Sequence, residues 1–268
     1  MLIDTHAHLE MKEFDADRKE VIERASQAGV GYIITVGTNL SLSRKALIIA
    51  GQNENIYATV GVHPHDVARA SDKTFDDLRD LVRDPKVVAY GEIGLDFFRN
   101  ISPREKQIEM FKRQLELAYD LNMPVIIHDR DAHEQTLSIV KASGVRRGVF
   151  HCFSGDYDMA RQCIDLGFYI SIPGVVTYNK AKTIQDVARQ IPLDSILLET
   201  DAPYLTPEPH RGKRNEPSFI VHTARKVAQI KGIPFEEVAD ITARNAMNLF
   251  DIKVKVTSQH DTLKRVAK

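Results

Sequence analysis

Histidines and carboxylates occur at the ends of several short β-rich runs, where they could bind metal ions. His6 and His8 are two residues apart. Because side chains alternate across a strand, both imidazoles point to the same side, which is the geometry for chelating one ion. The chain offers four further candidates of this kind: Glu92, His128, His151 and Asp201. Four imidazoles and two carboxylates exceed the ligands of one tetrahedral ion, so we expect two divalent ions bridged by Glu92.

The two carboxylates need an explanation because each follows an apolar run. Glu92 comes after residues 87–91, and burying an ionised acid there is costly unless it is paired or bound to a metal. A surface salt bridge is the alternative for Glu92. Asp201 could instead cap a helix, but Pro203 and Pro207 delay any helix at that point. We expect Glu92 and Asp201 to be catalytic, with Asp201 orienting a water molecule or moving its proton.

Other kinds of catalytic site find less support in the sequence. Cys152 adjoins His151, but neighbours on a strand face opposite sides, so we expect the cysteine to be buried packing. The sequence contains no G-x-S-x-G elbow, no G-x-x-x-x-G-K-[ST] phosphate loop and no G-x-G-x-x-G fingerprint. The remaining histidines are expected in the core or on the surface: His133, His210, His222 and His260.

Eight β-rich runs, separated by amphipathic segments, must position these residues. We expect strands at residues 2–6, 32–36, 56–62, 87–92, 125–128, 148–151, 168–171 and 195–199. The clearest helical pattern spans residues 102–121. A capping box of Ser102 and Glu105, with Pro103 at the first helical position, predicts where that helix begins.

Strands that alternate with helices at intervals of about twenty to forty residues imply βαβ units and a parallel sheet. Eight units have the size of a (β/α)8 TIM barrel, and a doubly wound open sheet is the alternative. In a barrel the C-terminal strand ends converge on one face, so the candidate ligands would share one pocket. We expect one hydrolase domain over residues 1–252 and a peripheral or partly disordered tail over residues 253–268.

Composition limits the possible partners and surroundings of the chain. Its 268 residues carry 36 Lys and Arg against 37 Asp and Glu, so no global field attracts nucleic acid or a membrane. Two cysteines are too few for a disulfide framework and favour a reducing, cytoplasmic setting. We expect no membrane span, because no apolar stretch reaches about 18 residues, and no signal peptide at the N-terminus.

The ordered set of motifs resembles the TatD family of metal-dependent deoxyribonucleases, within the amidohydrolase-like barrels. The matching segments are residues 4–8 (DTHAH), 61–65 (GVHPH), 91–96 (GEIGLD), 127–128 (IH), 151–155 (HCFSG), 199–205 (ETDAPYL) and 211–217 (RGKRNEP). The resemblance implies that His6, His8, Glu92 and Asp201 bind one metal, and that Glu92, His128 and His151 bind the second. The tail after about residue 253 lies outside it.

Two divalent ions bring more positive charge than Glu92 and Asp201 remove, so the pocket should select an anion such as a phosphodiester. His63 and His65 could contact the substrate phosphate, and Arg211, Lys213 and Arg214 form a basic run that could contact the nucleic-acid backbone. This run could equally be an ordinary solvated loop.

We therefore expect a deoxyribonuclease of the 3'-5' exonuclease type, acting on single-stranded DNA ends in repair or degradation, with no obligate protein partner. Imidazole-rich ligation suits zinc, manganese, nickel or cobalt better than magnesium, but it does not fix the metal. The identity of the metal stays open between Mg, Mn and Zn. The same two-metal site could hydrolyse an amide, ester or lactone, including an aminoacyl-tRNA ester. A non-catalytic barrel with structural metals is the third possibility.

Overall fold

The computed structural model describes residues 1–253, and its eight strands form one parallel sheet in chain order. The strands are β1 (Leu2–Ala7), β2 (Val30–Val36), β3 (Ile56–Val60), β4 (Val87–Asp96), β5 (Val125–Arg130), β6 (Gly148–Phe150), β7 (Phe168–Ile172) and β8 (Ile196–Leu198). Beyond β8, Ala202 bridges Ala7 of β1 in parallel, so the sheet closes almost completely on itself. The predicted (β/α)8 TIM barrel is confirmed, and the alternative of an open sheet is wrong.

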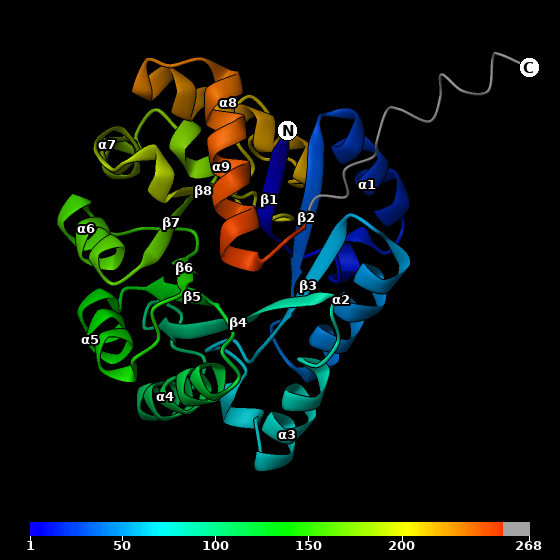
Figure 1. Cartoon of the computed structure of the whole chain (residues 1–268), viewed down its shortest axis with the longest axis vertical. Coiled ribbons are helices and arrows are strands. Elements are labelled where there is room, and N and C mark those ends of the chain that lie inside the picture. The colour runs from blue at the N-terminus through cyan, green and yellow to red at the C-terminus, as the bar shows by residue number, and fades with distance from the viewer. Residues whose placement is uncertain (254–268) are drawn as a thin grey trace, which may run out of the picture.

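Helices connect successive strands and surround the barrel (Figure 1). The α-helices are α1 (Arg18–Gln27), α2 (Leu40–Gln52), α3 (Asp72–Leu81), α4 (Arg104–Asp120), α5 (His133–Ser143), α6 (Tyr157–Asp165), α7 (Lys182–Gln190), α8 (Ile220–Lys231) and α9 (Phe235–Phe250). Short 3-10 helices lie at Lys12–Phe14, Val67–Arg69, Gly174–Thr177, Leu193–Ser195 and Pro217–Phe219.

The predicted capping box of α4 is wrong. The helix begins at Arg104 with Pro103 in the cap position and has no side-chain cap. The hydroxyl of Ser102 instead donates a hydrogen bond to the carbonyl oxygen of His65 at 2.9 Å and accepts one from the amide of Ala68 at 3.3 Å. Because Pro103 takes the cap position, the serine is free to hold the loop after β3.

The strand ends differ from prediction in places that matter for the site. β4 continues to Asp96, four residues beyond the expected end, whereas β6 ends at Phe150 and β8 ends at Leu198. His151 and Glu199 therefore stand in the loops directly after their strands.

The interior of the barrel is apolar toward the N-terminal ends of the strands, where α9 lies across the ring (Figure 1). One cluster joins Ile3, Ile34, Val36, Val88, Ala89, Ile126, Val149 and Leu197 of the strands to Ala243, Ala246, Leu249 and Phe250 of the helix. A second cluster packs the outer faces of the strands against the surrounding helices. With α9 at this end, the functional side chains gather at the other end.

Among residues 1–253, none of the helices has both the length and the apolar character needed to cross a membrane. Residues 254–268 of the predicted tail lie outside the described residues, and so does His260. The division between a domain and a tail at residues 252 and 253 stays a prediction.

Candidate metal centre

The first group of predicted ligands converges at the closure of the barrel. His6 and His8 come from the end of β1, and their Nε2 atoms are 3.3 Å apart. Nε2 of His6 is 3.5 Å from Oε2 of Glu92, and Nε2 of His8 is 3.4 Å from Oδ1 of Asp201. Ligand atoms about 2.1 Å from a tetrahedral ion are separated by about 3.4 Å. The spacing of these four side chains therefore fits a divalent ion at their centre.

Backbone pairing between β1 and the segment after β8 sets this spacing. The amide of Asp201 donates to the carbonyl oxygen of His6 at 2.8 Å, and the amide of His8 donates to that of Ala202 at 2.7 Å. Asp201 has a φ of 54°, in the left-handed region that aspartate tolerates better than most residues. The hydrogen bonds that close the barrel thus also assemble the ligand group.

The second group lies on the other oxygen of Glu92. Oε1 of Glu92 is 2.7 Å from Nδ1 of His128 and 2.8 Å from Nε2 of His151, and these two nitrogens are 3.3 Å apart. Oε2 of the same carboxylate faces His6. Glu92 therefore stands between two imidazole groups and presents one oxygen to each, which is the arrangement of a bridging carboxylate.

β4 and β5 approach closely where they carry these ligands. A Cβ atom on Gly94, whose φ is 149°, would lie 1.9 Å from the carbonyl oxygen of His128. Only glycine allows this approach of the two backbones. Gly94 therefore lets Glu92 and His128 lie side by side.

The electrostatics keep the carboxylates ionised. Burial alone would raise the pKa of Glu92, but His151, His63 and His128 outweigh it and hold that pKa well below the ordinary value. Burial also opposes ionisation of Asp201, yet His8 and His6 lower its pKa. Burial lowers the pKa of His6, whereas at His8 the carboxylates of Glu10 and Asp201 overcome burial and raise the pKa well above 6.5.

Three buried acids around the candidate ligands were not predicted as site residues: Glu10, Glu199 and Asp96. Oε1 of Glu10 and the carbonyl oxygen of Val36 both lie 3.1 Å from Nδ1 of His8, and Thr35 donates to the other oxygen of Glu10. Acceptors on Nδ1 keep its proton there and leave Nε2 with a lone pair for a metal. In the sequence, the signal for this role was an acid two residues after His8.

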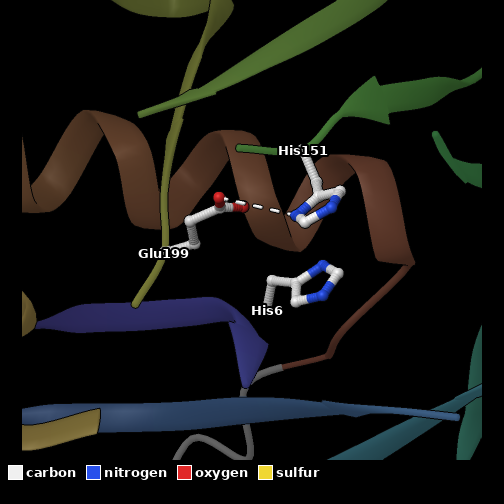
Figure 2. Close-up of side chains that lie close together, drawn as sticks. All are labelled: His6, His151 and Glu199. Atoms are coloured by element: carbon white, nitrogen blue, oxygen red, sulfur yellow. Dashed lines mark ion pairs between the residues drawn. The ribbon is translucent and has the colours of Figure 1, made fainter. Parts of the chain in front are cut away.

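Glu199 is the second of these acids, and Figure 2 shows its carboxylate facing the edge of the His151 ring, with the imidazole of His6 below that ring. Oε1 of Glu199 is 3.6 Å from Nδ1 of His151, and the rings of His6 and His151 stack with centroids 3.8 Å apart. Ligand atoms of all three residues lie within 4.8 Å of one another, so this trio could also hold an ion. Glu199 directly follows Leu198, the same pattern that drew attention to Glu92.

His63 and His65 lie on the loop after β3, beside the second group. Nε2 of His63 is 3.5 Å from Oε1 of Glu92, and His63, Glu92 and His128 form another set that could hold a metal. Nε2 of His65 lies 2.8 Å from Oδ2 of Asp96, which was not predicted as a site residue and is also 3.5 Å from Nε2 of His128. Burial holds the pKa of His63 well below 6.5, so this imidazole is neutral.

Two glutamines of α4 hold these loops in place. Gln114 accepts a hydrogen bond from the amide of Val62 and donates one to its carbonyl oxygen, at 2.8 and 2.9 Å. Gln107 makes the same pair of bonds with Asp96 and also donates to the carbonyl oxygen of Ser102. Both amides are buried, so α4 positions the residues that follow β3 and β4.

The three residues of the predicted basic run have different surroundings. Arg214 is engaged within the molecule, with Nη2 2.6 Å from Oδ2 of Asp17. The guanidinium of Arg211 lies over the ring of Tyr178, 4.3 Å from its centroid, and Lys213 is exposed. The contacts of these residues with nucleic acid stay a prediction, for which Arg214 is the least available.

Cys152 is not on a strand, because β6 ends before it, and its φ is 44°. Strand alternation therefore does not apply to Cys152, and the reason given for expecting it to face away from His151 is wrong. Burial, followed by the nearby charges of Asp201 and Glu199, raises the pKa of the thiol well above 9. Such a thiol stays protonated and makes a poor nucleophile.

Three of the histidines set aside from the sequence lie outside both ligand groups. His133 pairs with Asp129 at 2.7 Å, and His210 stacks on Phe219 close to His222.

Known proteins that are similar to this chain point to one family. The family model of TatD-related DNases matches residues 3–251. An uncharacterized metal-dependent hydrolase of Bacillus subtilis, YabD, is 43% identical over 254 residues, covering 94% of this chain and 100% of the relative. A protein of Erwinia tasmaniensis named 3'-5' ssDNA/RNA exonuclease TatD is 39% identical over 259 residues, covering 94% of this chain and 100% of its own length.

The crystal structure of YjjV, a TatD homolog from Escherichia coli K12, has the same fold, with a TM-score of 0.90 and 34% sequence identity. The match covers 94% of this chain and 98% of that one. By sequence and by fold, the chain belongs to the TatD family of metal-dependent hydrolases.

Proposed function

We propose that this chain is a deoxyribonuclease that removes nucleotides from 3' ends of single-stranded DNA. The observation that carries the proposal is the position of Glu92, whose two oxygens face two separate imidazole groups. A pair of divalent ions in such a site suits in-line displacement at phosphorus. The name of the Erwinia relative supports a nucleic-acid substrate and the 3'-5' direction.

Six residues of the chain would hold the two ions, and others orient these ligands. His6, His8, Glu92 and Asp201 would hold one ion, and Glu92, His128 and His151 would hold the other. Bound there, the ions would lower the pKa of a water molecule and polarise a phosphoryl oxygen. Glu10 and Val36 orient the imidazole of His8 through its Nδ1 atom.

Asp201 is the proposed proton acceptor. Its side chain is 14% exposed, whereas that of Glu92 is 3% exposed, so Asp201 is the carboxylate that water can reach. Its lowered pKa keeps it ionised and able to accept a proton or a hydrogen bond. His63, neutral and next to Glu92, is placed to donate a hydrogen bond to a substrate phosphate.

The test is cleavage of an end-labelled single-stranded oligonucleotide by chelator-treated protein, with Mg²⁺, Mn²⁺ or Zn²⁺ added back. We expect metal-dependent shortening from the 3' end, lowered by at least about 100-fold in Glu92→Ala and in Asp201→Ala. Glu236→Ala, an exposed glutamate of α9, is the matched control and should cleave like the wild type. The metal content of each protein is measured in parallel. We expect two ions per chain in the wild type and fewer in Glu92→Ala.

A protein that holds two metals and leaves DNA intact would contradict the proposal. The modest basic surface, with Arg214 paired to Asp17, favours the amide, ester or lactone alternative in that case. Release of product from a panel of carboxylic esters, including an aminoacyl-tRNA ester, would then identify it. A role in DNA repair and a cytoplasmic setting stay predictions from the sequence.

A further inference from the structure

Large apolar side chains are exposed beside the metal centre. Six such side chains occur among residues 1–253, and three of them lie on loops at the C-terminal end of the barrel: Phe98, Ile101 and Tyr204. Phe98 is 58% exposed and Ile101 is 62% exposed, both on the loop between β4 and α4. Leaving two such side chains in water forfeits burial free energy, so their position next to a candidate active site suggests a contact surface.

Hydrogen bonds hold the backbone of this loop. Phe97 donates its amide to the carbonyl oxygen of Arg130, and Arg99 donates its amide to Oδ1 of Asp96 at 2.7 Å. At the other end of the loop, Gln107 donates to the carbonyl oxygen of Ser102. The loop is therefore tied to β4, to β5 and to α4, and Phe98 is presented outward by a fixed backbone.

Positive charge accompanies the exposed ring. The guanidinium of Arg130 lies 4.1 Å from the centroid of Phe98. Neither Arg130 nor Arg99 has a carboxylate within ion-pair distance among the residues that the structure describes. Both side chains are exposed and can meet a phosphate group. An aromatic face together with unpaired cations is the combination by which proteins bind single-stranded nucleic acid.

The ring lies within reach of the metal centre. Phe98 is two residues beyond Asp96, which spans at most about 7 Å of backbone. Asp96 in turn contacts His65 and lies 3.5 Å from His128. When one nucleotide is bound at the metal centre, a base one or a few positions along the same strand can therefore reach Phe98.

We propose that Phe98, with Ile101 and Arg130, forms a stacking site for an unpaired base next to the scissile phosphodiester. This inference rests on the proposed nucleic-acid substrate. The ring accepts the face of a base, and the guanidinium binds the adjoining phosphate. Because a base in a duplex is already stacked on both faces, the site discriminates in favour of single strands.

Equilibrium binding tests the stacking site apart from cleavage. The probe is a fluorescein-labelled single-stranded phosphorothioate oligonucleotide, which resists hydrolysis, and it is titrated with the metal-loaded wild type and with Phe98→Ala and Phe98→Trp. We expect Phe98→Ala to raise Kd by about 5- to 100-fold and Phe98→Trp to bind like the wild type. Tyr119→Ala is the matched control, since Tyr119 is 61% exposed near the other end of α4, and it should leave Kd unchanged.

A second arm asks whether the loss comes from a base. Single bases of the probe are replaced in turn by an abasic unit, and the penalty of Phe98→Ala should vanish at one position and persist at the others. A duplex probe should show no penalty. Equal binding of Phe98→Ala and wild type, or a penalty that persists at every abasic position, would overturn the stacking site.

The two proposals fail separately. If the wild type shortens ordinary DNA and Phe98→Ala binds the probe normally, the nuclease proposal stands and the stacking site is wrong. If no DNA is cleaved but binding depends on Phe98 and on one base, the stacking site stands and the nuclease proposal is wrong.

Discussion

The two ends of the barrel interior use the same strands for opposite purposes. Toward the N-terminal ends, apolar side chains of the strands pack against α9. Toward the C-terminal ends, buried imidazoles and carboxylates face one another, and His6, Glu92 and His151 are each no more than 5% exposed. Burial of apolar surface stabilises the first region, whereas the second buries polar groups that require partners or metals.

Strand alternation links the apolar region next to α9, the apolar layer, to the region of buried imidazoles and carboxylates, the polar layer. Ile126 belongs to the apolar cluster, and His128, two residues later on the same face of β5, belongs to the candidate metal centre. The pairs Val149 with His151 and Leu197 with Glu199 repeat this spacing, although His151 and Glu199 stand in the loops directly after β6 and β8. Each of these strands therefore contributes to stability with one inward residue and to chemistry with the next.

The largest effect is expected when the apolar layer is damaged. Phe250→Ala removes a ring of α9 that is 2% exposed and should lower the free energy of unfolding by about 3–5 kcal/mol. Metal affinity of the folded variant should be unchanged, because within residues 1–253 the hydrogen bonds and ion pairs of the candidate ligands involve no residue of α9. Urea unfolding and metal titration measure the two quantities.

Asn248→Ala, an exposed position of the same helix, is the control and should change stability by less than about 0.5 kcal/mol. Loss of metal binding by folded Phe250→Ala would show that the layers are coupled.

The next effect concerns the polar layer alone. Glu10→Gln removes the charge beside Nδ1 of His8 and should weaken metal binding by about 10- to 100-fold at high pH. At lower pH the difference in metal affinity between the two proteins should narrow. The raised pKa of His8 makes protons compete with the metal in the wild type, and Glu10→Gln reduces this competition because it lowers that pKa. Calorimetric titration across the pH range above and below 6.5 measures this.

The same pKa predicts the stability of the metal-free protein. A raised pKa in the folded state means that the contribution of His8 is present below pH 6.5 and is lost as the pH rises through the raised value. Metal-free wild type should therefore lose unfolding free energy over that range, and Glu10→Gln should lose less. Identical pH profiles would show that Glu10 does not control His8.

A smaller effect is expected from the support that α4 gives to the polar layer. Gln114→Leu leaves the amide and carbonyl groups of Val62 without their partner and should cost about 1–3 kcal/mol of unfolding free energy. Gln162→Leu, at an exposed position of α6, is the matched control for thermal or urea unfolding. Equal stability of the two variants would mean that water or a new contact replaces Gln114.

The smallest effect is expected outside both layers. Arg214→Ala removes an exposed ion pair with Asp17 and should change the free energy of unfolding by at most about 1 kcal/mol. Affinity for single-stranded DNA should change by less than about twofold, since the guanidinium is already engaged. A large, salt-dependent loss of affinity would instead return Arg214 to the phosphate-contacting role that its sequence position predicts.

Much of the fold and of the centre follows from local pattern. The period of two explains why His6 and His8 face the same way, and their Nε2 atoms do lie together. The eight β-rich runs correspond to eight strands, because each run must bury its apolar side chains in the barrel. Asp96 and Glu199 were not predicted because each contacts a histidine that is distant in sequence. Glu10 lies only two residues after His8, but its role depends on the burial that the fold gives it.

The sequence by itself determined the alternation of strands and helices, because apolar periodicity reports which faces must leave water. That alternation predicted a barrel and left an open sheet as the alternative, which the closure of the strands decided. The sequence also determined which residue types could bind metal. Only the tertiary structure decided which oxygen of Glu92 faces which group, because β1 and β4 depart from regular register beside their ligands. Such shifts depend on contacts such as the approach of Gly94 to His128, which no local pattern encodes.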